Sequence, residues 1–123
     1  MTDPPEASWP LSSWPLFIYG SLKRTRDAAE RMRGARFLRA AATEPGWTLL
    51  DLGRYPGLVR GNGHVVGELY AVPPDLLVRL DAYEGTAEGY YERIAIALAD
   101  GTAAQTYHYT GDRSMARPHG AEW

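Results

Sequence analysis

One helix, with both ends marked by residue type, constrains the fold of this chain of 123 residues more than any other feature. Pro73-Pro74-Asp75 is typical of a helix start for two reasons. The N–H groups of the first turn have no partner within the helix, so proline, which has no N–H, is tolerated there. The acidic residue lies at the positive end of the helix dipole. Gly85 marks the other end, because glycine adopts the left-handed backbone that often closes a helix. Between these ends the apolar residues recur at i, i+1, i+4 and i+7 and share one face: Leu76, Leu77, Leu80 and Tyr83. The pattern predicts a helix with one buried face.

Short strands account for most of the remaining pattern. The run from Leu16 to Tyr19 is compact, apolar and stopped by Gly20, which is typical of a buried strand. The segment from Tyr90 to Leu98 alternates between apolar and polar residues, and Thr102 to Thr110 returns after an Asp100-Gly101 turn. Three more runs predict strands: Phe37 to Ala42, Trp47 to Leu52, and His64 to Val72 after a Gly61-Asn62-Gly63 hairpin turn.

These segments predict a single α+β domain. A second helical candidate covers Arg26 to Arg33, with Gly34 just beyond it. Because five to seven strands with two inserted helices do not alternate as βαβ units, we expect a mixed, barrel-like sheet with helices packed around it. The Pro-rich residues 1–14 are expected to form a flexible arm and residues 15–123 the domain, with an irregular tail from about Gly111.

Composition excludes several classes of function. The chain has no cysteine, so disulfides, thiolate nucleophiles and cysteine metal sites are absent. The three histidines, His64, His108 and His119, lack the spacing of metal ligands, so we expect no metal. Ser21 lacks the glycine-flanked setting of a serine hydrolase nucleophile, and the glycines around Gly61 lack the strand–loop–helix context of a nucleotide loop.

Charge and hydropathy bear on partners and compartment. A net charge of −2 argues against a nucleic-acid partner, and acidic residues interrupt the basic ones between Lys23 and Arg39. No apolar stretch approaches the roughly 20 residues that cross a bilayer. Residues 1–14 lack the basic start and the apolar run of a secretory signal. We therefore expect a cytoplasmic protein without a membrane partner, either a monomer or a small homo-oligomer.

Two segments could carry chemistry, and the first is Tyr19-Gly20-Ser21-Leu22 at the end of the predicted buried strand. Glycine permits a backbone turn with positive φ, and serine is a good cap for a following helix. Successive amide N–H groups at such a bend form a concave anion site that suits a carboxylate or an oxyanion. The same four residues also fit a tight strand-to-helix turn without a ligand, so both interpretations stay open.

The second segment contains Glu84, at the end of the predicted helix. The helix dipole disfavours a negative charge there by roughly 0.3–1 kcal/mol. Asp81 lies one turn earlier, and Glu88 and Glu92 follow closely. Like charges and burial both raise the pKa of a carboxyl group toward the range in which it exchanges protons near neutral pH. The alternative is that Glu84 is a solvated surface residue without a chemical role. Its position in the sequence does not decide between these two interpretations.

Four motifs are, in their order and spacing, similar to those of the γ-glutamylcyclotransferase-like family, also called AIG2-like. Each motif is weak alone, whereas the four together are fairly specific. The resemblance runs from about residue 16 to 110 and extends to a final aromatic residue, Trp123. The motifs are Tyr19-Gly20-Ser21-Leu22, Gly67-Glu68-Leu69-Tyr70, Leu80-Asp81-Ala82-Tyr83-Glu84-Gly85 and Tyr91-Glu92-Arg93.

The resemblance implies a small mixed β-barrel, no cofactor and a defined reaction. In this reaction the α-amine of the substrate attacks its own γ-carbonyl, which gives 5-oxoproline and a free amine, so the enzyme is of the lyase or acyltransferase type. Glu84 matches the family's catalytic acid/base. The remaining matches imply a role in holding the glutamyl group or supporting the pocket: Tyr19, Gly20, Ser21, Leu22, Tyr91 and Arg93.

The resemblance also bears on the substrate. The chain is compact and looks like members that act on γ-glutamyl amines, including one that unmasks an aminoglycoside antibiotic during its synthesis. A small-molecule γ-glutamyl amide is therefore the expected partner. Two alternatives remain open: a non-catalytic ligand-binding or interaction protein on the same fold, and a different hydrolase or transferase that uses the same pocket.

Overall fold

A computed structural model describes residues 13–20 and 31–123. The predicted first helix, Arg26 to Arg33, falls mostly outside the described residues, as does most of the predicted arm. The described part contains eight strands and one helix. They are β1 (Trp14–Ile18), β2 (Arg36–Ala42), β3 (Trp47–Asp51), β4 (Pro56–Arg60), β5 (Val66–Val72), α2 (Pro74–Glu84), β6 (Tyr91–Ala97), β7 (Ala103–Tyr109) and β8 (Arg117–Gly120).

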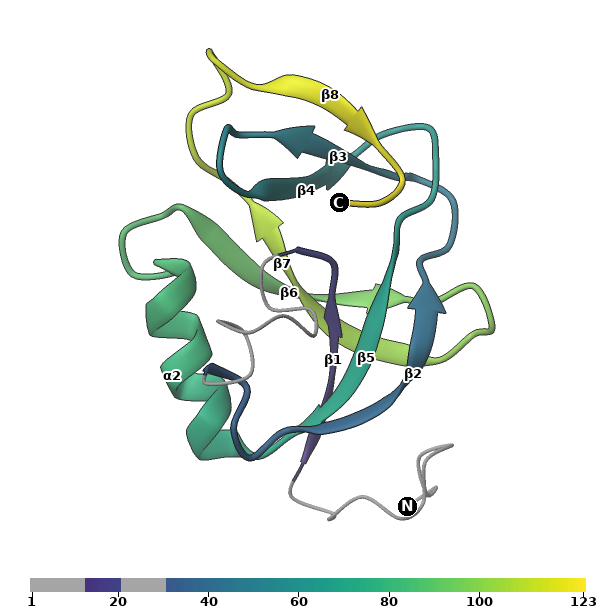
Figure 1. The fold of residues 1–123 in the computed structure, drawn as a ribbon, viewed down its shortest axis with the longest axis vertical. Helices are drawn as coiled ribbons and strands as arrows, with labels where there is room; N and C mark the ends of the chain where they lie inside the picture. Colours follow the sequence, from purple (N-terminus) through teal and green to yellow (C-terminus); the bar gives the residue numbers. More distant parts are fainter. Residues whose placement is uncertain (1–12, 21–30) are drawn as a thin grey trace.

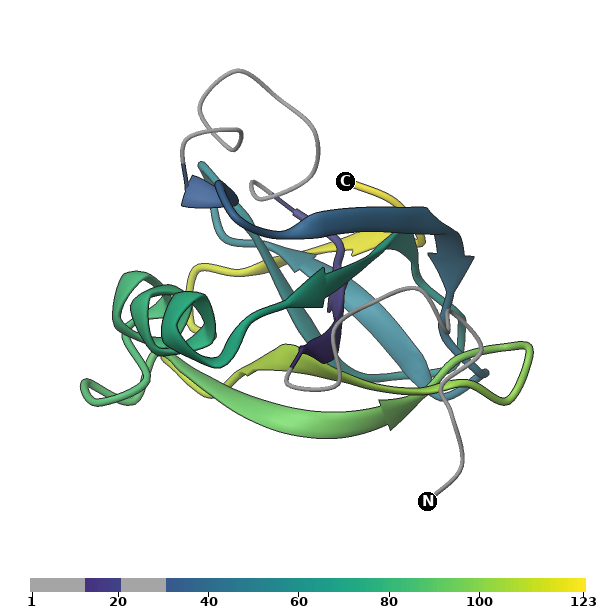
Figure 2. The same cartoon turned by 90° about the horizontal axis from the view of Figure 1, so that it is seen from below.

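All eight strands belong to one mixed, curved sheet, as Figures 1 and 2 show. The strand order is β2-β5-β1-β7-β4-β3-β8, and β6 pairs with β7 beside this path. β7 pairs in parallel with β1 and β4, whereas the other pairs are antiparallel. A single bridge between Thr43 and Leu98 connects the chain after β2 to the chain after β6. The sheet is not closed, so the α+β prediction is confirmed for a curved, open sheet.

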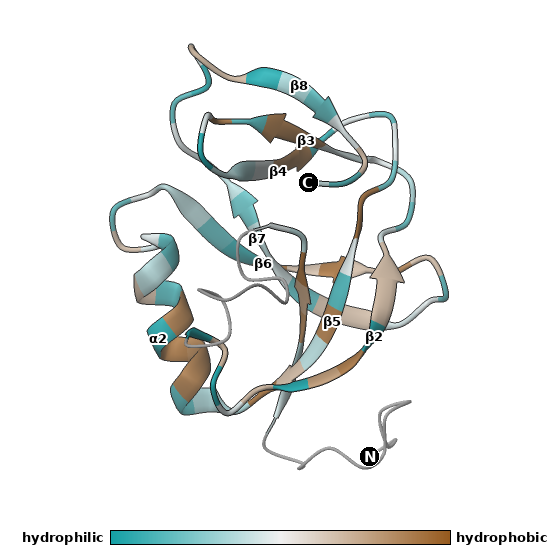
Figure 3. Ribbon diagram, in the orientation of Figure 1, coloured by the Kyte–Doolittle hydropathy of each residue, from teal (hydrophilic) through white to brown (hydrophobic). Residues whose placement is uncertain are grey.

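Alternate residues of β1 enter two separate hydrophobic cores, because successive side chains of a strand point to opposite faces. Leu16 and Ile18 belong to the core that α2 covers. Phe17 belongs to the other core, which includes Leu49 and Leu58 from β3 and β4. Leu16 and Phe17 are fully buried. Figure 3 shows apolar colouring on β1, on part of β3 and on the lower turns of α2.

Helix α2 forms where the sequence predicts it, from Pro74 to Glu84. Gly85 follows with φ 71°, and its N–H donates to a carbonyl of the last helical turn, which confirms the predicted stop. Leu76, Leu77 and Leu80 are buried against the sheet. Tyr83, predicted on the same face, is 44% exposed, because the helix extends past the edge of the core at that turn.

Three expectations about the sheet need correction. β4 and β8 had no predicted counterpart: β4 is short and begins with Pro56, and β8 is an exposed four-residue strand in the tail expected to be irregular. Residues 61–63 do not close a hairpin, because β4 pairs with β3 and β7 whereas β5 pairs with β1 and β2. The connection from β4 to β5 therefore crosses from one part of the sheet to another.

The left-handed backbone of Gly85, which ends α2, predicts that alanine at this position lowers stability more than alanine at Gly89 does. Gly85→Ala should lower the free energy of unfolding by about 1–2 kcal/mol for the left-handed backbone alone. A further loss is expected because a Cβ there would lie 2.6 Å from Cδ2 of Tyr90. Gly89→Ala is the matched control, since Gly89 has φ 82° and no atom within 4 Å of the added Cβ. Urea unfolding that shows equal losses for both variants would contradict this.

Candidate functional site

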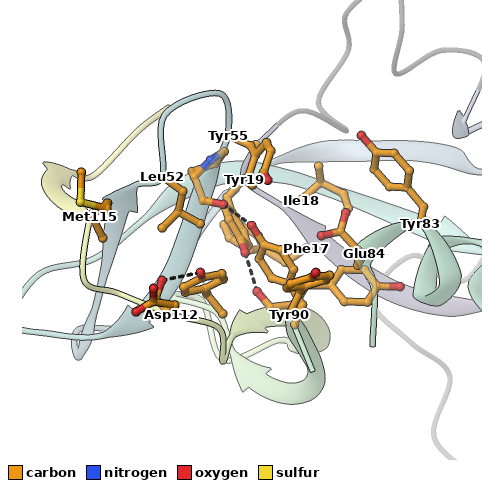
Figure 4. Close-up of a pocket in the computed structure, with 16 residues that line it drawn as sticks. Phe17, Ile18, Tyr19, Leu52, Tyr55, Tyr83, Glu84, Tyr90, Asp112 and Met115 are labelled. Atoms are coloured by element: carbon orange, nitrogen blue, oxygen red, sulfur yellow. Dashed lines mark hydrogen bonds between the residues drawn. The ribbon is translucent and has the colours of Figure 1, made fainter. Parts of the chain in front are cut away.

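A cavity of about 460 Å³ opens where the end of β1 meets the end of α2 (Figure 4). Its walls come from β1, the loop before β4, the end of α2, strands β6 and β7, and residues 112–116. Seven of the eight tyrosines of the chain line it. They are Tyr19, Tyr55, Tyr83, Tyr90, Tyr91, Tyr107 and Tyr109.

Hydrogen bonds hold three of these rings in place, as the dashed lines in Figure 4 show. The hydroxyl of Tyr19 donates to the carbonyl of Tyr107 at 2.5 Å and accepts the N–H of Leu58 at 3.2 Å. The hydroxyl of Tyr91 donates to the carbonyl of Pro56 at 2.7 Å. The hydroxyl of Tyr109 donates to the carbonyl of Asp112 at 2.6 Å. Because each of these phenols has donated its single proton, the three rings form a fixed wall.

The carboxyl group of Glu84, the last residue of α2, faces this cavity. Burial raises its pKa to about 7, the positive charge of Arg31 opposes the shift, and the negative charge of Asp81 adds to it. Within the described residues no hydrogen-bond partner of the Glu84 carboxyl is found. A carboxyl group that is half protonated near neutral pH can both accept and donate a proton.

Asp81, one helical turn earlier, has the opposite environment. Arg93 donates from Nε to Oδ1 at 2.9 Å and from Nη2 to Oδ2 at 3.1 Å, and the Tyr107 hydroxyl donates to Oδ1 at 2.7 Å. Gln105 in turn accepts a hydrogen bond from Nη1 of Arg93. The bidentate pair fixes the Asp81 carboxylate beneath the end of the helix. Two carboxyl groups one turn apart thus differ in role: one is bound, and the other is available to the cavity.

The cavity brings together four of the predicted site residues and leaves out one. Tyr19, Gly20, Glu84 and Tyr91 line it. Arg93 does not line the cavity. It forms an ion pair with Asp81, which lies one helical turn before Glu84. Ser21 and Leu22 lie outside the described residues. The resemblance implies a supporting role near the pocket for Arg93, and the structure places it beside Asp81, outside the lining of the cavity.

Gly20 is required for a different reason from the one expected. The sequence suggested a turn with positive φ, but Gly20 is absent from the glycines that have one. Instead, a Cβ at Gly20 would lie 2.6 Å from Cγ of Pro56 and 2.9 Å from its Cδ. Contact of this kind is not possible without a shift of the chain. Glycine lets the end of β1 approach Pro56, whose carbonyl holds Tyr91.

Sequence reasoning missed the far wall of the cavity. Tyr55, Asp112 and Met115 come from a loop and from the tail that was expected to be irregular. No local pattern places these residues together, because parallel pairing of β4 with β7 brings their segments side by side. The available signal was composition: eight tyrosines are many for a chain of this length, and most precede or follow turns.

The part of the chain that the structure describes offers neither a metal-ligand cluster nor a membrane-spanning helix. Among residues 13–20 and 31–123, no group of three or more histidine, aspartate or glutamate side chains could hold a metal ion. The helix that the structure describes is neither long nor apolar enough to cross a membrane.

The environment of Glu84 predicts how stability depends on pH. The folded state holds a proton on Glu84 up to about pH 7, whereas the unfolded chain releases it near pH 4.5, so wild-type stability falls as pH rises through this window. Glu84→Gln cannot ionise and should gain on the order of 3 kcal/mol relative to wild type above this window. Urea unfolding from about pH 4 to about pH 9 checks this, and a constant difference between the two proteins would contradict it.

This chain is similar in sequence and in fold to known proteins of one family. Residues 16–123 match the family described as "Gamma-glutamyl cyclotransferase, AIG2-like". The "Gamma-glutamylcyclotransferase family protein YtfP" of Escherichia coli K12 is 38% identical over 88 residues, which cover 72% of this chain and 76% of that protein. The solution structure of E. coli ytfP aligns with a TM-score of 0.71 at 32% identity, over 89% of this chain and 95% of that chain.

Two further proteins are similar to this chain. "Gamma-L-glutamyl-butirosin B gamma-glutamyl cyclotransferase" of Niallia circulans is 32% identical over 106 residues, covering 79% of this chain and 67% of that protein. An AIG2-like protein of Mus musculus has the same fold, with a TM-score of 0.69 at 24% identity over 90% of this chain and 88% of that chain. The residues that match the family, 16–123, include most of β1 and all of α2, which meet at the cavity.

Proposed function

Because this chain belongs to the gamma-glutamyl cyclotransferase, AIG2-like family, we propose that it releases an amine from a γ-glutamyl amide by cyclising the glutamyl group to 5-oxoproline. The observation that carries the proposal is the Glu84 carboxyl, which faces the cavity with a pKa raised to about 7. The reaction needs one group that takes a proton and then returns one. A carboxyl group with this pKa is suited to both steps.

The proposed reaction balances without a cofactor. The α-ammonium of the substrate gives a proton to Glu84, and the free α-amine attacks the γ-carbonyl carbon to form the new C–N bond of the lactam. The carbonyl oxygen carries the charge in the tetrahedral intermediate. When the intermediate collapses, the bond to the leaving nitrogen breaks, and Glu84 protonates that nitrogen. The Glu84 carboxylate then takes the second proton of the lactam nitrogen and passes it to the freed amine, which leaves as an ammonium ion. Because attack is intramolecular, the protein mainly has to hold the glutamyl chain in a folded conformation.

The donors for the oxyanion and the glutamyl group come, in this proposal, from the backbone of Tyr19 to Leu22. The phenol groups at the cavity floor are already committed: Tyr19 donates to Tyr107 and Tyr91 donates to Pro56. Backbone N–H groups at a strand end are effective donors to an oxyanion because they need no reorganisation during the reaction. Tyr91 and Arg93 act as supports, since one fixes Pro56 and the other fixes Asp81.

We assign the substrate to the γ-glutamyl amines. The relative from Niallia circulans, named for γ-L-glutamyl-butirosin B, supports this assignment, because its name describes removal of a γ-glutamyl group from a larger molecule. The open mouth of the cavity supports it as well, since exposed Tyr55, Tyr83 and Tyr90 leave room beyond the glutamyl group.

Loss of the Glu84 carboxyl should abolish turnover but not folding. Glu84→Gln should lower kcat by about 10²–10⁴-fold, because an amide can neither accept nor donate the required proton. Glu88→Gln is the matched control, since Glu88 is exposed and does not line the cavity. The assay is release of 5-oxoproline from a γ-glutamyl amide. A rate for Glu84→Gln within a few-fold of wild type would remove Glu84 from the mechanism.

Two substitutions in the Tyr19–Leu22 segment separate backbone from side-chain roles. Ser21→Ala should change kcat/KM little, because the backbone N–H groups remain. Gly20→Val should lower both kcat/KM and the affinity for 5-oxoproline, because its side chain would push the strand end away from Pro56. Both variants are compared well below their Tm. An inactive Ser21→Ala beside an active, tightly binding Gly20→Val would instead indicate that Ser21 is a nucleophile.

A further inference from the structure

The cavity extends well past Glu84. In Figure 4, Glu84 and Tyr83 lie at one end of the view, whereas Leu52, Asp112 and Met115 lie at the other. Tyr109 belongs to this far end, because its hydroxyl donates to the carbonyl of Asp112. We call the group formed by Leu52, Tyr55, Tyr109, Asp112 and Met115 the distal subsite.

The cavity is larger than a γ-glutamyl group, so the distal subsite can hold another part of the substrate. At roughly 30 Å³ per non-hydrogen atom, the share of a water molecule in the liquid, a γ-glutamyl group of about nine such atoms takes about 270 Å³. The cavity measures about 460 Å³. With the scissile bond held beside Glu84 and the glutamyl group at the end of β1, the remaining space is available to the amine half of the substrate.

The chemistry of the lining indicates what this half is. Aromatic faces and a thioether favour flat, apolar groups. Among the described residues that line the cavity there is no lysine, arginine or histidine, whereas two carboxyl groups, of Glu84 and Asp112, are present. A leaving group with its own carboxylate would meet these like charges in the lining, which disfavours it, whereas the charge of Arg113 acts on Tyr109 from outside the lining.

The exposed surface of the described residues supports the same conclusion. Six large hydrophobic side chains are exposed among them, and four of these line the cavity. Tyr55 is 49% exposed and Met115 is 88% exposed. Exposed apolar groups that gather at one cavity mark a binding surface, because an isolated protein gains nothing from leaving them in water.

We propose that the distal subsite binds the amine half of the γ-glutamyl amide and selects amines that carry an aromatic or similarly bulky apolar substituent and no carboxylate. This inference rests on the function proposed above. It adds a rule of selection to that function: the γ-glutamyl derivative of an arylalkylamine is preferred over that of a short alkylamine and over that of the corresponding amino acid.

Three substrates isolate the two features. The γ-glutamyl derivatives of phenethylamine and ethylamine differ by the phenyl ring, and those of phenethylamine and phenylalanine differ by one carboxylate. For the wild-type protein we expect kcat/KM for the phenethylamide to exceed both others by about ten-fold or more. Tyr55→Ala should reduce the ratio between phenethylamide and ethylamide several-fold. Val78→Ala is the matched control, because Val78 is an exposed apolar residue of α2 outside the cavity.

Binding is measured separately from turnover, so the two proposals can fail independently. Calorimetric titration of Glu84→Gln with the same three compounds should show the same order in Kd. Equal turnover of all three amides, or faster turnover of the phenylalanine derivative, would overturn the distal subsite while supporting the cyclotransferase function. No 5-oxoproline from any of them would overturn the function, and the order of the Kd values would still decide the subsite: the expected order supports it, and equal affinities overturn it.

Discussion

The packing of α2 against the sheet positions the candidate site. Leu76, Leu77 and Leu80 of the helix enter the same core as Leu16 and Ile18 of β1, and each buried leucine contributes about 1.5–3 kcal/mol to the interaction. This contact fixes the rotation of the helix about its axis. The last helical turn then extends past the core, which brings Glu84 to the cavity.

The same contact separates the two carboxyl groups of α2. Asp81 lies where β6 and β7 supply Arg93 and Tyr107, so its charge is bound by hydrogen bonds. Glu84 lies one turn further, where burial raises its pKa and Asp81 adds a like charge. One helix thus presents a carboxylate that is fixed by hydrogen bonds and, one turn later, a carboxyl group with a raised pKa. This division of roles supports the proposed acid/base chemistry more than either residue does alone.

The parts of the fold that depend on local signals were predictable from the sequence. The helix with its proline start and glycine stop, the apolar strand β1, and the hairpin of β6 and β7 each follow from residues close in the chain. The parts that depend on pairing between distant segments were not: β8 pairs with β3, and the far wall of the cavity forms where β7 lies beside β4. Gly20 shows the same limit, because its requirement comes from Pro56, which is far away in the sequence.

The proposed acid/base role of Glu84 depends on its raised pKa, and this pKa can be measured directly. The chemical shift of the Glu84 side-chain carboxyl carbon, followed by NMR from acid to alkaline pH, reports the protonation of that group alone. A midpoint at about pH 7 is the predicted result. A midpoint near 4.5, the value of an ordinary glutamate, would mean that water reaches the carboxyl group freely, and it would contradict the assignment of Glu84 as the proton carrier.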